Sequence, residues 1–177
     1  MRTSGTVDSV LRPLAECPVQ AYLTNVLQVA DVVEWCIEQL QGEATIRQTS
    51  FSISEEFIRR LYNMRKKGNV KEVELVLDHK ATNKTLRLWP FIVQTIDKVF
   101  LADNHSKIIL IEADGPFRIA IVTSQNLTRG NRQESAVITT CENVYTDMLR
   151  EFQNIMTRHS VPMHELFCEK ICLSEYI

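Results

Sequence analysis

The sequence contains no apolar run that approaches the ~20 residues needed to span a bilayer. Residues 1–20 also lack the apolar centre of a secretory signal peptide. The formal net charge of −2 provides no overall basic field, so nucleic-acid binding would have to depend on a local patch. The sequence has no internal repeat and no low-complexity tract. We therefore expect a globular, cytoplasmic protein.

Patterns typical of metal sites and disulfides are equally sparse. The cysteines are odd in number and lie on segments that we expect to be helical or terminal: Cys17, Cys36, Cys141, Cys168 and Cys172. Cys168 and Cys172 are four residues apart, but no second pair of ligands follows at a spacing typical of a zinc site. We expect reduced thiols, no bound metal and no cofactor.

Length and composition are those of one ordinary globular domain. The 177 residues are 45% hydrophobic and 24% charged, and a chain of this size buries roughly two-thirds of its unfolded surface. Residues 1–18 carry glycine, serine and two prolines. We expect residues 1–25 to form an N-terminal arm or lead-in, and residues 26–177 to form a single domain.

Hydrophobic periodicity predicts both helices and strands. Helices are expected at residues 29–40, 54–67, 83–92 and 145–156. Ser54 and Asn83 suit the N-caps of the second and third helices, and Pro90 should kink or divide the third. Strands are expected at residues 45–53, 73–77, 98–101, 107–112, 118–123 and 135–139. This order predicts an α/β fold in which a mixed β-sheet is flanked by helices.

The most informative segment is residues 104–135. It holds two strand-like runs rich in β-branched residues, Lys107–Glu112 and Arg118–Thr123. The turn-forming residues 114–116 separate them, so that the runs should pair as a hairpin. Polar side chains gather at the strand ends: His105, Lys107, Ser124, Asn126 and Glu134.

This set of side chains suits a phosphate ester. An imidazole can act as a nucleophile on phosphorus or as a general acid near neutral pH. Ammonium and carboxamide groups can bind the non-bridging oxygens as charge builds on them. A carboxylate can bond the far ring nitrogen and fix the tautomer of the imidazole.

The segment resembles the phospholipase D superfamily, whose hallmark is H-x-K-x4-D, followed after a strand by G-S-x-N and then an acidic residue. The corresponding residues are His105-Ser106-Lys107, Glu112, Thr123-Ser124-Gln125-Asn126 and Glu134. Glu112 takes the place of the aspartate, where we expect a structural role, and Thr123 takes the place of the glycine. The resemblance is consistent with the chain from about Val29 to Met156, and it implies a phospholipase D-like fold.

The resemblance also implies a reaction, namely phosphodiester hydrolysis without a metal and through a phosphohistidine. In that reaction His105 attacks phosphorus, while Lys107 and Asn126 bind the phosphoryl oxygens. Glu134 would hold the imidazole, and Ser124 would add a hydroxyl bond to the phosphate or to the neighbouring loop.

The superfamily builds its site from two motifs, whereas this sequence has a single H-x-K. None of the remaining histidines (His79, His159 and His164) has a lysine two positions on. The sequence is similar to the small bacterial single-motif nucleases, which form their site between two copies. We therefore expect a homodimeric endonuclease, with Arg129 and Arg132 in contact with the nucleic-acid backbone.

Other interpretations remain open. The same chemistry serves a phospholipase or a phosphatidyl transferase, although no wide apolar surface segment favours a lipid. The departures at Glu112 and Thr123 also fit a non-catalytic module that uses the phosphate pocket to bind nucleic acid. For Arg129 and Arg132, a role as solvated loop charges is as consistent with the sequence as a nucleic-acid contact. For His79, a role as an ordinary loop residue is more consistent than a ligand contact.

Overall fold

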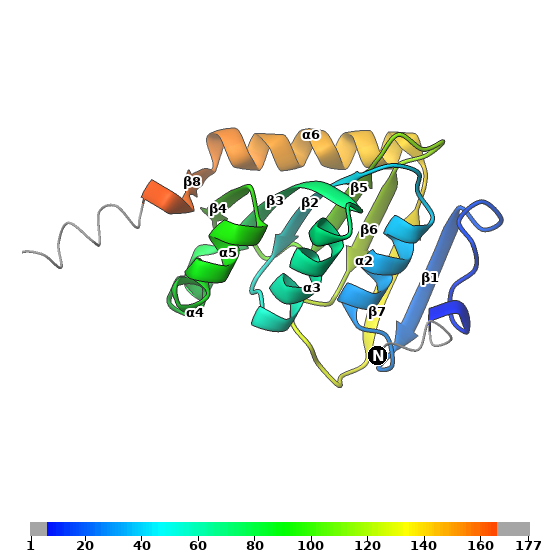
Figure 1. Cartoon of the computed structure of the whole chain (residues 1–177), viewed down its shortest axis with the longest axis horizontal. Coiled ribbons are helices and arrows are strands. Elements are labelled where there is room, and N and C mark those ends of the chain that lie inside the picture. The colour runs from blue at the N-terminus through cyan, green and yellow to red at the C-terminus, as the bar shows by residue number, and fades with distance from the viewer. Residues whose placement is uncertain (1–6, 166–177) are drawn as a thin grey trace, which may run out of the picture.

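The computed structural model describes residues 7–165 (Figure 1). Within this range, eight strands form one sheet in the order β1-β7-β6-β5-β2-β3-β4-β8. The strands are β1 (Val19–Thr24), β2 (Ala44–Ser50), β3 (Val70–Asp78), β4 (Lys98–Ala102), β5 (Ile108–Glu112), β6 (Ile119–Thr123), β7 (Glu134–Thr139) and β8 (Ser160–Pro162). The helical elements are α2 (Val29–Glu38), α3 (Glu55–Lys66), η1 (His79–Ala81), α4 (Thr82–Arg87), α5 (Trp89–Thr95) and α6 (Glu142–Arg158).

The strand directions bring the ends of many strands to one edge of the sheet. β2 pairs in parallel with β3, and β3 with β4, whereas β5, β7 and β8 run antiparallel to their neighbours. The carboxyl ends of β1, β2, β3, β4 and β6 therefore meet the amino ends of β5, β7 and β8. We call this edge the polar edge, because the segments that leave it carry His79, His105, Lys107, Ser124 and Asn126.

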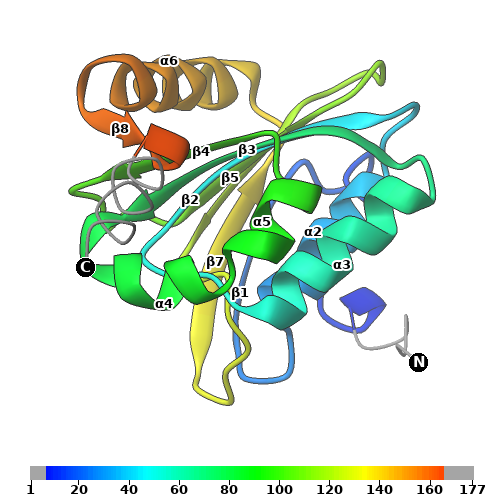
Figure 2. The same ribbon diagram turned by 60° about the vertical axis from the view of Figure 1, so that its left-hand side comes forward.

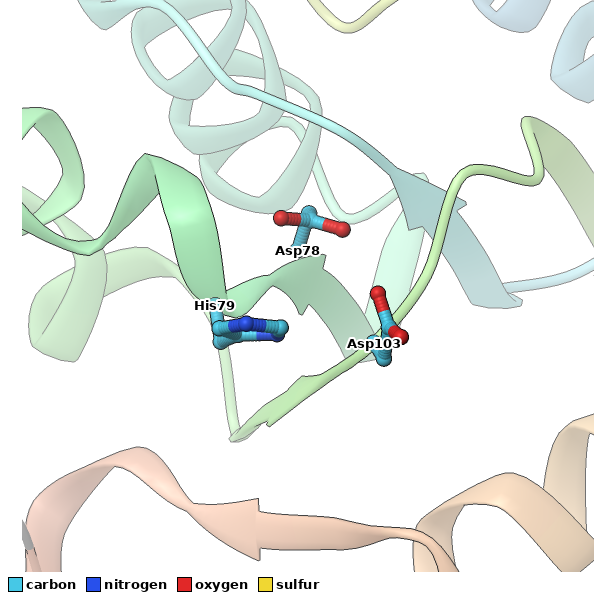
Figure 3. Close-up of side chains that lie close together, drawn as sticks. All are labelled: Asp78, His79 and Asp103. Carbon is cyan, nitrogen blue, oxygen red and sulfur yellow. The ribbon is translucent and has the colours of Figure 1, made fainter.

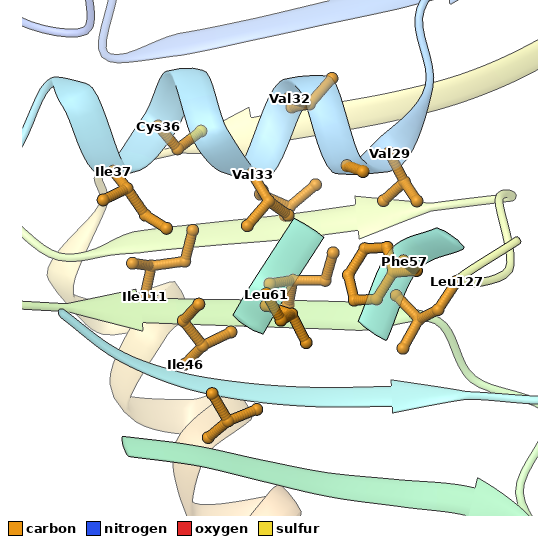
Figure 4. Packing of buried hydrophobic residues seen from close by; sticks show 14 of the residues in the cluster. Val29, Val32, Val33, Cys36, Ile37, Ile46, Phe57, Leu61, Ile111 and Leu127 are labelled. Carbon is orange, nitrogen blue, oxygen red and sulfur yellow. The ribbon is translucent and has the colours of Figure 1, made fainter. Parts of the chain in front are cut away.

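Helices cover both faces of the sheet, as Figure 2 shows. α2, α3 and α5 lie on one face, where Val33, Leu61, Ile46 and Ile111 pack into the larger apolar core (Figure 4). α6 lies on the other face and buries Tyr145 and Phe152 in a second, smaller cluster. Burial of these apolar side chains is the main favourable contribution to folding. The expected mixed sheet flanked by helices is confirmed.

Local signals in the sequence account for most helix limits. Ser54 caps α3, and its hydroxyl accepts a hydrogen bond from the N–H of Phe57 at 3.3 Å. The helix expected at residues 83–92 is divided at Leu88 into α4 and α5, with Pro90 in the first turn of α5, where its missing N–H is tolerated. Asn83 is not the cap of α4, because Ala81 occupies that position.

The N-terminal region differs from the expected arm. Residues 1–6 lie outside the described range, but Val7, Leu11 and Leu14 are buried in the larger core. β1 then pairs with β7 over its full length. The boundary expected at residue 25 therefore does not separate a free arm from the sheet, because the chain before it supplies an edge strand and core side chains.

Two further expectations concern membranes and thiols. None of the helices in residues 7–165 has the length and apolar character needed to cross a bilayer. Cys17, Cys36 and Cys141 are free thiols, and burial raises the pKa of Cys36. Cys168 and Cys172 lie outside the described residues.

Candidate active site

The two halves of the H-x-K and S-x-N motif meet at the polar edge. β5 and β6 form the expected antiparallel pair, and the N–H of Thr123 donates to the carbonyl of Lys107 at 3.0 Å. One strand further, the N–H of Ser124 donates to the carbonyl of Ser135 at 3.0 Å. These bonds hold the segment before β5, the segment after β6 and the start of β7 next to one another.

His105 lies exposed in the loop between β4 and β5. Its carbonyl accepts a hydrogen bond from Nζ of Lys107 at 2.9 Å. Its ring meets that of Phe51 edge to face, with the ring centroids 6.0 Å apart and the planes at 62°. Among residues 7–165 the imidazole has no hydrogen-bond partner, so both ring nitrogens are available to a substrate.

A buried asparagine fixes the loop that carries His105. Asn104 is only 5% exposed, and its N–H donates to Oδ2 of Asp78 at 3.1 Å. Its Oδ1 accepts from the N–H of Ser106 at 3.2 Å, while Nδ2 donates to the carbonyl of Ser50 at 3.4 Å. The loop is thus attached to the ends of β2 and β3. Sequence reasoning did not find this role, because the partners of Asn104 lie 26 and 54 positions away.

Asn126 is attached to the end of β2 as well. Its Oδ1 lies 3.4 Å from Oγ of Ser50, whose proton is donated to the carbonyl of Ser52 at 2.8 Å, and the N–H of Leu127 donates to the same Oγ at 3.1 Å. In the described part of the chain Nδ2 of Asn126 donates to no group. The side chain therefore keeps a free amide donor, as a ligand of a phosphoryl oxygen requires.

Ser124 and Glu134 form a pair of their own. Oγ of Ser124 donates to Oε2 of Glu134 and accepts from the N–H of Ser135 at 3.0 Å. The carboxylate is thereby held at the polar edge by the serine. The contact between Glu134 and the imidazole of His105 stays a prediction.

Arg129 and Arg132 are exposed in the loop that joins β6 and β7. Gln28, the residue before α2, anchors this loop through two bonds with the backbone of Gly130 at 2.9 and 3.1 Å. Arg129 makes one exposed ion pair with Glu56 at 3.6 Å, and such pairs are weak. Both guanidinium groups remain accessible to an anionic ligand, and their proposed contact with nucleic acid is untested.

Glu112 lies at the opposite end of β5, far along the strand from His105. It accepts a hydrogen bond from Nη1 of Arg47 at 2.6 Å and forms a second ion pair with Arg118 at 3.4 Å. Partial burial by itself would raise the pKa of Glu112, but the bond and the charge of Arg47 outweigh it and lower the pKa. These contacts agree with the structural role expected for this residue.

A second polar cluster lies further along the same edge, where Asp78, His79 and Asp103 bring three ligand atoms within 4.8 Å of one another (Figure 3). Both oxygens of Asp78 already accept backbone N–H bonds, from Lys80 at 2.7 Å and from Asn104 at 3.1 Å. Nζ of Lys80 also lies 3.6 Å from Oδ1 of Asp103. Because an ammonium group and two backbone donors already occupy the carboxylates, we assign no cation to this cluster.

No protein-family model and no curated protein matches the sequence. Solved structures do match. A phospholipase D family member, Nuc from Salmonella typhimurium, is similar with a TM-score of 0.64 and 18% identity, over 81% of this chain and 96% of that one. NucT from Helicobacter pylori has a TM-score of 0.60 and 13% identity, over 81% of this chain and 98% of that one. Phosphatidylserine synthase from Haemophilus influenzae has a TM-score of 0.55 and 16% identity, over 81% of this chain but 39% of that one. The chain therefore has the phospholipase D fold.

Proposed function

We propose that this protein is a metal-independent phosphodiesterase that cleaves nucleic acid at a site shared by two copies of the chain. The observation that carries the proposal is the arrangement of His105, Lys107 and Asn126 at one sheet edge. The imidazole and the amide nitrogen of Asn126 are unengaged within residues 7–165, and the ammonium is bonded to an uncharged carbonyl. A nucleophile and two donors that are available together suit a phosphoryl group.

The proposed reaction has two displacements at phosphorus. In the first, a ring nitrogen of His105 bonds to phosphorus while the bond to the leaving alkoxide breaks, and the partner's His105 gives its proton to that alkoxide. In the second, the partner's His105 takes a proton from water, and the water oxygen displaces the first imidazole from phosphorus. Lys107 and Asn126 of both copies bind the non-bridging oxygens throughout, which positions the phosphate and stabilises its developing charge.

An uncovered apolar face next to the site supports the second copy. Ala21, Val137 and Val122 lie side by side in the register of β1, β7 and β6, and all three are exposed. Leu23, which follows on the same face of β1, is 74% exposed. Val122 lies two residues before Ser124, so the row reaches the site. Exposed apolar patches of this kind mark interaction surfaces, and a two-fold contact would bring two copies of one motif together.

Light scattering tests this surface separately from the chemistry. Leu23→Asp should convert a dimeric parent into a monomer, because it places a charge within the proposed apolar contact. Val93→Asp is the matched control, since Val93 is also exposed but belongs to α5 on the opposite face. A Leu23→Asp variant that stays dimeric would contradict this surface.

A lipid headgroup is the second candidate substrate, because a phosphatidylserine synthase shares the fold. With this substrate, the protein would transfer or hydrolyse a phosphatidyl group, using the same residues. Cosedimentation with anionic liposomes, compared with binding of plasmid DNA, separates the two substrates. Lipid binding without DNA binding would overturn the nuclease proposal.

The enzyme proposal is tested by hydrolysis of bis(p-nitrophenyl) phosphate in EDTA. We expect turnover by the parent and a loss of at least about 10⁴-fold in His105→Ala, since the nucleophile itself is removed. His79→Ala is the control and should retain turnover. An inactive parent that still binds DNA would instead support the non-catalytic module.

A further inference from the structure

We propose that Phe51 is a positioning residue that sets the direction of the His105 ring. This inference rests on the proposed function, and it adds a residue outside the H-x-K and S-x-N motifs. Phe51 directly follows β2 at the polar edge and is partly buried.

The contact has the geometry of an attractive aromatic pair. The ring centroids of Phe51 and His105 are 6.0 Å apart and the planes are inclined at 62°. This separation lies within the range of about 4.5–7 Å in which aromatic rings attract each other edge to face. Since the imidazole makes no hydrogen bond to any of residues 7–165, the phenyl ring is its one directional contact there.

The backbone of Phe51 is itself fixed to the site. Oγ of Ser50 donates to the carbonyl of Ser52 at 2.8 Å, which closes a tight loop around Phe51. The same Oγ approaches Oδ1 of Asn126 at 3.4 Å and accepts from the N–H of Leu127 at 3.1 Å. Phe51 is therefore held by the segment that carries Asn126, and its ring reaches across to the segment that carries His105.

This arrangement has a consequence for the chemistry. The backbone of His105 is fixed by Asn104 and Lys107, but its side chain can still rotate about two bonds. A nucleophile has to lie in line with the leaving group, and small errors of direction cost rate. The phenyl ring restricts the imidazole to orientations that keep the edge-to-face contact, and thus orders the nucleophile before the substrate binds.

The test compares Phe51→Leu, which keeps an apolar side chain, with Phe51→Tyr, which keeps the ring. We expect Phe51→Leu to lower kcat about tenfold with KM unchanged, and Phe51→Tyr to remain within about twofold of the parent. Phe91→Leu is the matched control, because Phe91 is also a partly exposed aromatic residue but lies on α5. It should leave kcat unchanged.

A second readout does not depend on activity. The ring-current shift of the His105 carbon-bound protons, measured by NMR on the full chain, should disappear in Phe51→Leu and persist in Phe51→Tyr and Phe91→Leu. An unchanged His105 spectrum in Phe51→Leu would overturn the inference, as would a loss of kcat that Phe51→Tyr shares. If the parent has no turnover, the proposed function fails while the NMR comparison still decides the position of the ring.

Discussion

His79 and His105 lie at the same edge of the sheet, and their surroundings differ. His79 follows β3, and its Nδ1 lies 3.2 Å from the carbonyl of Ala102. His105 precedes β5, and its ring contacts Phe51 without a hydrogen bond to any of residues 7–165. Each histidine has a lysine nearby, so that residue type alone does not distinguish the two places.

The lysines show the same difference. Nζ of Lys80 pairs with Asp103 at 3.6 Å, whereas Nζ of Lys107 is bonded to the uncharged carbonyl of His105 at 2.9 Å. The Lys80 pair is exposed and therefore weak, but Asp103 still lowers the attraction of this place for an anion, whereas Lys107 pairs with no carboxylate among residues 7–165. The difference indicates where a site lies at this edge: its charged side chains are held in place by the fold, but no opposite charge neutralises them.

After the loss expected for His105→Ala, the largest expected effect separates these two lysines. Lys107→Met should lower kcat by roughly 10²–10³-fold, because it removes a cation that stabilises the transition state. Lys80→Met should leave turnover close to that of the parent. The measurement is steady-state hydrolysis of bis(p-nitrophenyl) phosphate in EDTA, and equal losses in both variants would show that the two lysines do not differ in their role.

A second prediction concerns Asp78, which connects the backbone next to His79 with the backbone next to His105. Asp78 is 2% exposed and accepts N–H bonds from both Lys80 and Asn104. Asp78→Ala should lower the free energy of unfolding by roughly 3 kcal/mol, because two backbone donors lose their partner. Asp103→Ala removes an exposed carboxylate and should change it by less than about 0.5 kcal/mol. Urea denaturation measures both, and a stable Asp78→Ala variant would show that the bonds contribute little.

Much of the fold could be predicted from the sequence because the signals are local. The β-branched runs and the turn between them predicted β5 and β6, and the polar residues at their ends predicted where the motif lies. β1 was missed since its outward side chains are apolar: Val19 and Leu23 are exposed, and only Tyr22 is buried. Its residues do alternate, but the apolar set is the exposed one, so the usual pattern of an apolar inner face does not mark it as a strand of this sheet.

The supporting residues could not be predicted, because they depend on which strands are neighbours. β2 lies between β3 and β5, although β5 begins more than fifty residues later in the chain. That order places Ser50 against Asn126 and Phe51 against His105. Sequence periodicity predicts a strand and its faces, but it carries no information on lateral order.

The smallest expected effect compares Glu112, at the end of β5, with Glu134, at the start of β7. The pKa of Glu112 lies below its ordinary value of 4.5, since the bond and charge of Arg47 outweigh partial burial. The stabilisation is therefore present above pH 4.5 and is lost as the pH falls through the lowered pKa. Glu112→Gln should reduce the free energy of unfolding by about 1 kcal/mol at neutral pH and by progressively less as the pH falls through the lowered pKa, with kcat unchanged.

Glu134→Gln is the matched change at the polar edge, and it should show the opposite pattern. Its carboxylate is bonded to Ser124, outside the Arg47 ion pairs, so that we expect little change in stability and a lower kcat. Urea denaturation across this pH range, together with the diester assay, measures both quantities. If Glu112→Gln lowered kcat as much as Glu134→Gln, the far end of β5 would belong to the site. The assignment of a structural role to Glu112 and a catalytic role to Glu134 would then be wrong.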